Sequence, residues 1–209
     1  EPETVSVVPA ATTAERVDQY VTHVNQQEKQ ALLTIMLSEE PIDRALVFTR
    51  TKHGADRVVR LLGGNGIAAH AIHGNKSQGQ RERALAAFKS GEVKILVATD
   101  IAARGIDISG VSHVFNFELP NVPEQYVHRI GRTARAGASG VAISFCAEDE
   151  RPYLRDIEKL TRQGVPVRAL PADFMKRAEA LKASRVRAHG PDPAPREARP
   201  RGARPPARP

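Results

Sequence analysis

Short apolar runs alternate with stretches of helical periodicity along the middle of the chain. The apolar runs are rich in Val, Ile, Leu and Ala, which is typical of strands that are buried on both faces. The stretches between them place apolar residues three and four positions apart, which predicts amphipathic helices. The predicted strands are residues 45–49, 67–72, 93–99, 111–117 and 140–145, and the predicted helices are residues 24–37, 55–62, 77–91 and 148–162, together with one that begins near Pro123.

Residues that favour helix ends occur where this pattern changes. Ser77 and Gln80 have the spacing of a capping box, and Gly91 follows the last position of the same predicted helix. Strands that alternate with helices predict an α/β fold, with a mostly parallel sheet and helices on both of its faces. The first 25 residues are predicted to be an incoming linker and an edge strand.

The net charge of +7 is concentrated at the end of the chain. Residues 171–209 hold ten Lys and Arg against four Asp and Glu, whereas the first 170 residues hold 21 against 20. The same segment holds eight of the fifteen prolines. Such a composition buries too little apolar surface to offset its ordering entropy, which predicts a mostly disordered, cationic tail. The tail is interpreted as a segment that seeks polyanions, with a merely solubilising role as the alternative.

Composition also narrows the class of protein. The chain of 209 residues is 41% hydrophobic and 26% charged, as in globular domains. No apolar run approaches the roughly 18 residues of a membrane span, and the amino terminus has no signal-peptide pattern. The single cysteine, Cys146, lies in an apolar run. These features predict a cytoplasmic protein without a membrane segment or disulfides. No histidine has metal-ligand spacing with a cysteine or a carboxylate pair, so no metal site is predicted.

Polar residues follow each predicted strand. Ligands of open α/β sheets bind beyond the carboxyl ends of the strands, and hydroxyls, arginines and glycines at four such ends indicate one shared anionic ligand. These strand ends carry Thr49–Arg50, His73–Gly74, Thr99–Asp100 and the stretch YVHRIGRTARAG at residues 126–137.

The stretch at residues 126–137 holds His128 and three arginines. Arg132 and Arg135 are three positions apart, so on a helical turn they share one face and can grip one multiply charged group. The alternative is that the arginines pair with neighbouring carboxylates, but the sequence has none between Glu124 and Glu148. The pattern therefore favours a bound anion.

Two further stretches carry candidate chemistry with open alternatives. In ATDIAARGIDI, residues 98–108, Asp107 could accept from sugar hydroxyls and Thr99 could donate to a phosphate; the alternative is a plain strand–loop connection. Gln78 and Arg81 lie on the first turn of their predicted helix, where the dipole favours an anion. The alternative for Arg81 is a solvated position paired with Glu82 or another neighbour.

These motifs together resemble the second RecA-like domain of a DEAD-box ATP-dependent RNA helicase. VFTRT resembles motif IV, SQGQR the following QxxR element, ATDIAARGID motif V and HRIGRTAR motif VI, and the resemblance covers about residues 15–165. Motifs V and VI in this order are highly specific, whereas the QxxR element alone is weak. Ala134 replaces the glycine usual in motif VI. The sequences of these motifs are similar to those of the bacterial RhlE type.

The resemblance implies a RecA-like fold and a division of the chain into three parts. These are an interdomain linker at residues 1–14, a helicase domain at residues 15–170 and the basic tail at residues 171–209. It also implies ATP with Mg²⁺, RNA and an N-terminal RecA-like domain as ligands and partners, together with proteins of ribonucleoprotein particles, ribosome assembly or RNA decay.

Roles for individual residues follow from the same resemblance. Arg132 and Arg135 are expected to reach the γ-phosphate, with Arg135 as the arginine finger, and His128 to link the interface to the DEAD residues. Asp107 is expected to hold the ribose, beside Gly105, and Arg104 to support the domain contact. The RNA-facing residues implied are Thr49, Arg50, Gly74, Gln78, Arg81 and Thr99.

The chain has no G-x-x-x-x-G-K-[ST] loop and no DEAD sequence. The family keeps both in its first domain, so the chain is expected to be the C-terminal half of the enzyme and inactive by itself. Two alternatives stay open. One is a stand-alone RNA-binding module without catalysis, and the other is a DNA-directed helicase of the same superfamily.

Overall fold

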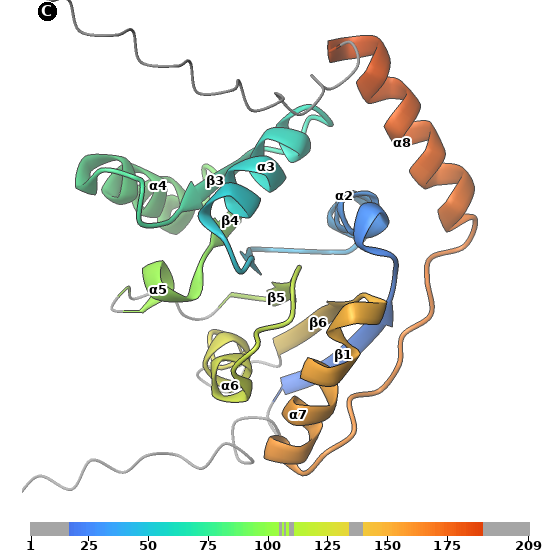
Figure 1. Ribbon diagram of the computed structural model, residues 1–209. Coiled ribbons are helices and arrows are strands. Elements are labelled where there is room, and N and C mark those ends of the chain that lie inside the picture. Colours follow the sequence, from blue (N-terminus) through green and yellow to red (C-terminus); the bar gives the residue numbers. More distant parts are fainter. Residues whose placement is uncertain (1–16, 105, 107, 109–110, 134–139, 190–209) are drawn as a thin grey trace, which may run out of the picture.

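The computed structural model describes residues 17–104, 106, 108, 111–133 and 140–189. Its centre is one six-stranded sheet with the order β1-β6-β5-β2-β4-β3, and every strand pair is parallel. The strands are β1 (Val17–His23), β2 (Ala45–Phe48), β3 (Ala69–Ile72), β4 (Ile95–Ala98), β5 (His113–Asn116) and β6 (Gly140–Cys146) (Figure 1). The predicted α/β class is confirmed, and so is an edge strand within the first 25 residues.

Helices cover both faces of the sheet, as predicted. Strand residues alternate between two apolar clusters: Leu46 and Phe48 of β2 belong to one, and Ala45 and Val47 belong to the other. The first cluster is shared with α4 (Gln78–Ser90), α5 (Asp100–Ala103), α6 (Pro123–Ile130) and α7 (Arg151–Thr161), and the second with α2 (Lys29–Glu39), α3 (Lys52–Gly63) and α8 (Phe174–His189). Short 3-10 turns, η1 (Gln26–Glu28) and η2 (Glu148–Glu150), precede α2 and α7.

The residues expected at helix ends act as expected in α4 and α6. The Ser77 hydroxyl accepts from the Gln80 amide at 3.3 Å, and the Gln80 side chain accepts from the Ser77 amide at 2.9 Å. Gly91 ends α4 with a φ of 81°, a conformation that costs glycine little. Pro123 is the first residue of α6. The predicted capping box is therefore confirmed.

Two helices occur where the sequence predicted none. The short helix α5 lies in the stretch expected to be a loop after β4. The helix α8 lies inside the segment predicted to be disordered, so that prediction is wrong for residues 174–189; residues 190–209 lie outside the described part of the chain. Its apolar residues Phe174, Ala178 and Leu181 recur at helical spacing and pack on the cluster that includes α2. No proline interrupts residues 174–189, and averaging over the Pro-rich end of the chain concealed this local pattern.

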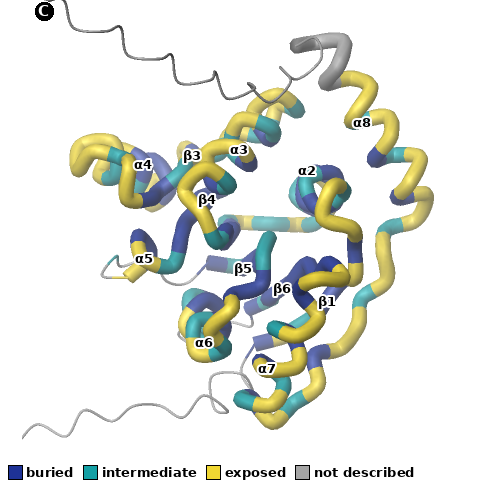
Figure 2. Tube along the Cα trace, in the orientation of Figure 1, coloured by how far each residue is buried: buried dark blue, intermediate teal, exposed yellow. Residues whose placement is uncertain are grey.

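Burial follows this layered arrangement. The central strands β2, β4 and β5 are buried along their whole length, whereas among residues 174–184 of α8 only Phe174 and Ala178 are buried (Figures 1 and 2). The Cys146 thiol is buried at the end of β6, and burial raises its pKa to about 11. The boundaries of the three predicted parts of the chain stay predictions.

Candidate functional site

The parallel sheet brings four strand ends to one edge. In the register of the sheet, Phe48 lies opposite both Ala98 and Asn116, and Ala98 lies opposite Ile72. The polar residues that follow these positions therefore leave the sheet side by side. This is the arrangement that the sequence predicted for a shared ligand.

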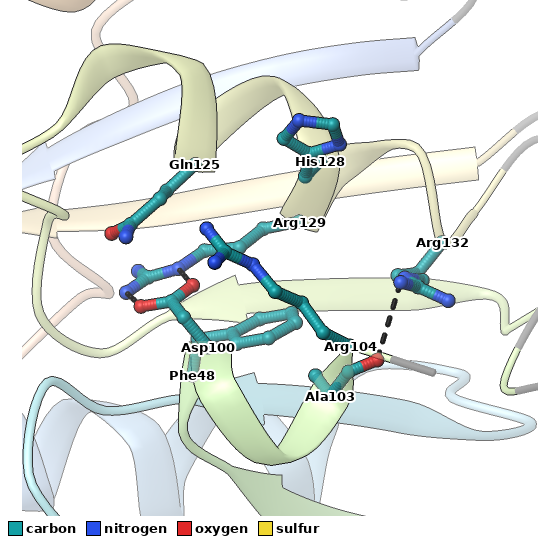
Figure 3. A pocket seen from close by; sticks show the side chains of 8 residues that line it. All are labelled: Phe48, Asp100, Ala103, Arg104, Gln125, His128, Arg129 and Arg132. Carbon is teal, nitrogen blue, oxygen red and sulfur yellow. Dashed lines mark hydrogen bonds and ion pairs between the residues drawn. The ribbon is translucent and has the colours of Figure 1, made fainter. Parts of the chain in front are cut away.

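A pocket lies at this edge between α5 and α6. Its lining includes Arg104 from the end of α5, together with His128 and Arg132 from α6 and the turn that follows (Figure 3). Arg104 and His128 are exposed, and Arg132 is half-buried. The complete lining is Phe48, Asp100, Ala103, Arg104, Gln125, His128, Arg129 and Arg132.

Arg129 lies at the wall of this pocket and is almost completely buried, with 1% of its surface exposed. Its Nε and Nη2 atoms donate to the two carboxylate oxygens of Asp100, each at 2.7 Å. Its Nη1 atom donates to the Glu118 carbonyl at 2.7 Å and to Asn116 Oδ1 at 3.2 Å. The guanidinium also lies over the Phe48 ring, 5.0 Å from the ring centre. Arg129 is therefore held at once by the ends of β2 and β5 and by the start of α5.

This contact corrects one part of the sequence interpretation. The arginines of residues 126–137 were expected to point at a bound anion because no carboxylate lies near them in the sequence. For Arg129 this was wrong, since its partner Asp100 is 29 residues away. A fully paired, buried arginine is a structural group that fixes α5 against α6.

Arg132 bridges the same two elements in a different way. Its Nη1 atom donates to the Ile106 carbonyl at 3.1 Å, and its Nη2 atom donates to the Ala103 carbonyl at 3.2 Å. These bonds tie the turn after α6 to the loop after α5. The expected role of Arg132 at a phosphate stays a prediction, as does that of His128. Gly105, Asp107 and Arg135 lie outside the described residues.

The six residues expected to face RNA occupy different environments. Thr49 and Thr99 are buried, and the Thr49 hydroxyl donates to the Thr51 carbonyl at 3.1 Å. Gly74 and Gln78 are exposed and Arg81 is half-buried at the start of α4. Glu82, the acid considered as a partner of Arg81, instead accepts from Gln78 Nε2 at 2.9 Å. Arg81 has no ion-pair partner among the described residues.

Arg50 lies in a network that the sequence did not predict. Its side chain is 30% exposed, and its Nη2 atom lies 3.8 Å from Glu118 Oε1 and 3.5 Å from Glu150 Oε1. Glu150 is completely buried and forms an ion pair with Lys29, which is also completely buried. Nothing in the sequence joins Lys29 to Glu150, because the two residues lie 121 positions apart.

The described part of the chain has neither a candidate metal site nor a candidate membrane helix. No group of three or more His, Cys, Asp or Glu residues there could hold a metal ion. None of the helices described is long and apolar enough to cross a membrane.

The pocket between α5 and α6 lies within a stretch that matches a known family. The model of the helicase conserved C-terminal domain matches residues 27–137, more than half of the chain. The chain belongs to this family. It is a helicase C-terminal domain of the DEAD-box type, since the relatives and solved structures similar to it are DEAD-box proteins.

One relative and two solved structures show how similar the chain is to this family. The DEAD-box ATP-dependent RNA helicase CshA of Geobacillus kaustophilus is 47% identical over 78% of this chain and 35% of its own length. The structure of Escherichia coli SrmB bound to regulator of ribonuclease activity A is 37% identical, with a TM-score of 0.70 over 73% of this chain and 90% of that one. The structure of Saccharomyces cerevisiae Dbp5 bound to RNA and ADP BeF3 is 30% identical, with a TM-score of 0.71 over 88% of this chain and 48% of that one.

The chain spans about a third of the length of the curated relatives that it matches. The RecA-like fold expected from the resemblance is confirmed by the solved structures. The narrower similarity to the RhlE type stays a prediction, because these relatives are named CshA.

Proposed function

We propose that this helicase C-terminal domain supplies one side of an ATP site between two domains, and one half of an RNA-binding track, in an ATP-dependent RNA helicase. The observation that carries the proposal is the pocket between α5 and α6. There, motifs V and VI meet at the carboxyl edge of the sheet and present Arg104, His128 and Arg132. Cationic groups at such an edge fit a phosphate that is held mainly by another domain.

The ion pair of the buried Arg129 with the partly buried Asp100 gives this pocket a fixed frame. Phosphoryl transfer depends on positioning and on charge stabilisation rather than on covalent chemistry by the protein. ATP with Mg²⁺ supplies the transferable phosphoryl group and the metal charge, and both are held by the N-terminal domain. Arg132 and Arg135 approach the γ-phosphate, Asp107 and Gly105 hold the ribose side, and Arg104 and His128 support the contact with the other domain.

The RNA track lies along the remaining strand ends. Gln78 and Arg81 lie on the first turn of α4 and Gly74 lies in the segment between β3 and α4, and backbone amides and a cation at a helix start suit a phosphate. Arg50 lies on a neighbouring strand end and extends the track, and the buried Thr49 and Thr99 lie behind it at the ends of β2 and β4. Contacts of this kind read the RNA backbone and discriminate little between base sequences. The similar structure of Dbp5 contains bound RNA, which supports RNA as the ligand. We place the protein in the cytoplasm, with ribonucleoprotein, ribosome-assembly or RNA-decay proteins as partners.

The test is RNA-stimulated ATP hydrolysis by the two-domain protein with the substitution Arg135→Lys. Arginine fingers contribute about 10³ to 10⁵ in rate in related phosphoryl transfers, and lysine keeps the charge but loses the planar fork. We expect turnover to fall at least about tenfold while ATP and RNA still bind. A variant with unchanged turnover would show that Arg135 is not the finger. RNA binding without hydrolysis by the unaltered protein would favour the binding module.

A further inference from the structure

We propose that Glu150 is a positioning residue for RNA binding, which holds the guanidinium of Arg50 in place and is itself held by the buried cation of Lys29. The inference rests on the proposed role of Arg50 in the RNA track. It concerns two residues, Lys29 and Glu150, for which neither the motifs nor the pocket gives a role.

The carboxylate of Glu150 collects donors from four parts of the chain. Its Oε2 atom accepts from Lys29 Nζ at the start of α2 and from the Ala147 amide at 2.9 Å. Its Oε1 atom accepts from the Leu119 amide at 3.2 Å and lies 3.5 Å from Arg50 Nη2. Glu150 therefore joins the segments that leave β2, β5 and β6 at the carboxyl edge of the sheet.

The buried ion pair of Lys29 and Glu150 is poorly explained by its contribution to folding stability. Both side chains are fully buried, and burial lowers the pKa of Lys29, although the charge of Glu150 opposes this shift. Replacing such a pair by apolar residues of similar volume is often neutral or stabilising. A positional role is therefore the better explanation for two charges inside the domain.

Arg50 is the group that gains a fixed position. Its backbone amide donates to Glu118 Oε2 at 2.8 Å, and its guanidinium lies over the Tyr153 ring at 5.6 Å from the ring centre. Together with Glu150, these contacts hold a side chain that is still 30% exposed. A free arginine loses rotamer entropy when it is ordered, so an arginine already held in place binds a phosphate with a smaller entropic cost.

The charges of the network allow one substitution to distinguish two roles of Arg50, according to whether RNA affinity rises or falls. Lys29 and Arg50 are balanced by Glu118 and Glu150, so the group is formally neutral. The substitution Glu150→Gln adds one positive charge next to the track. If Arg50 acted only through its charge, RNA would bind more tightly to this variant. If Glu150 positions Arg50, RNA binds more weakly in spite of the added charge.

The experiment is a double-mutant cycle on RNA affinity, measured with a fluorescent single-stranded RNA and the two-domain protein. We expect Glu150→Gln to weaken binding about fivefold in the unaltered background, which corresponds to about 1 kcal/mol of lost preordering. In the Arg50→Ala background it should change nothing further, because residues that act through one another are not additive. The matched control is Asp149→Asn, which removes a charge from the exposed neighbouring residue and should leave affinity within about twofold.

A second variant keeps the test decisive if Glu150→Gln fails to fold. Lys29→Met combined with Glu150→Leu removes both buried charges together, a change that buried pairs often tolerate, and it should weaken RNA binding to the same degree. Tighter binding by Glu150→Gln, or an equal loss with and without Arg50, would overturn the inference. An unaltered protein that binds no RNA would overturn the proposed function and the inference together.

Discussion

Arg129 and Arg132 lie three positions apart in one motif, but they have different surroundings. Arg129 is buried and donates four hydrogen bonds to Asp100, Asn116 and the Glu118 carbonyl, whereas Arg132 is half-buried and binds two backbone carbonyls at the pocket. Sequence spacing predicted a shared cationic face for Arg132 and Arg135. It could not show that Arg129 has a carboxylate partner from a distant strand end, because that contact depends on tertiary packing.

The burial of Arg129 predicts unequal losses of stability for two arginine substitutions at this pocket. Arg129→Ala leaves the Asp100 carboxylate, whose side chain is 16% exposed, without its partner. We expect the free energy of unfolding to fall by about 3 to 5 kcal/mol. Arg104→Ala, at an exposed position in the same pocket, should change it by about 0.5 kcal/mol or less. Chemical denaturation of both variants checks this, and an equal, small loss in both would contradict the structural role of Arg129.

At the scale of elements, the apolar pattern predicted the sheet and missed two helices. The predicted strands all occur, because buried parallel strands leave a clear run of apolar residues. The helix α5 is only four residues long and leaves no periodic signal. The helix α8 was hidden by the composition of the segment around it, although Phe174, Ala178 and Leu181 form an apolar stripe. The composition of residues 171–209 as a whole therefore predicted disorder, whereas the local spacing of the apolar residues would have predicted the helix.

The packing of α8 on α2 predicts the effect of one substitution in that stripe. Phe174 is 3% exposed, and Phe174→Ala should remove roughly 3 kcal/mol of packing. We expect the amides of α8 to lose protection from hydrogen exchange while those of the central strands keep theirs. Met175→Ala is the control, because Met175 is 52% exposed. Unchanged protection in α8 of the Phe174 variant would show that this contact does not hold the helix.

At the scale of the whole molecule, the excess positive charge is divided between the segment that contains α8 and the residues that follow it. Residues 190–209 hold five Arg against one Asp and one Glu. Because α8 packs on the domain, a deletion that tests this charge should begin after His189 and keep the helix. The composition defined the tail as residues 171–209. The deletion is therefore limited to the residues beyond α8, 190–209.

Deleting residues 190–209 should make RNA binding less sensitive to salt. Each phosphate neutralised on a single strand contributes about −0.7 to the slope of log affinity against log salt. If this segment engages three or four phosphates, the slope should become shallower by roughly 2 to 3 units, and equally for unrelated RNA sequences. Arg81→Ala should change it by about one unit or less. An unchanged slope after deletion would favour a solubilising role for the segment.

The central claim is that this chain forms one side of an ATP site and that another domain forms the other side. The most direct test is steady-state phosphate release from ATP, with RNA present, by this chain alone, by the N-terminal domain alone and by the two joined. We expect turnover only in the joined protein, because the chain has no phosphate-binding loop and no DEAD sequence. Turnover by this chain alone at the rate of the joined protein would contradict the account.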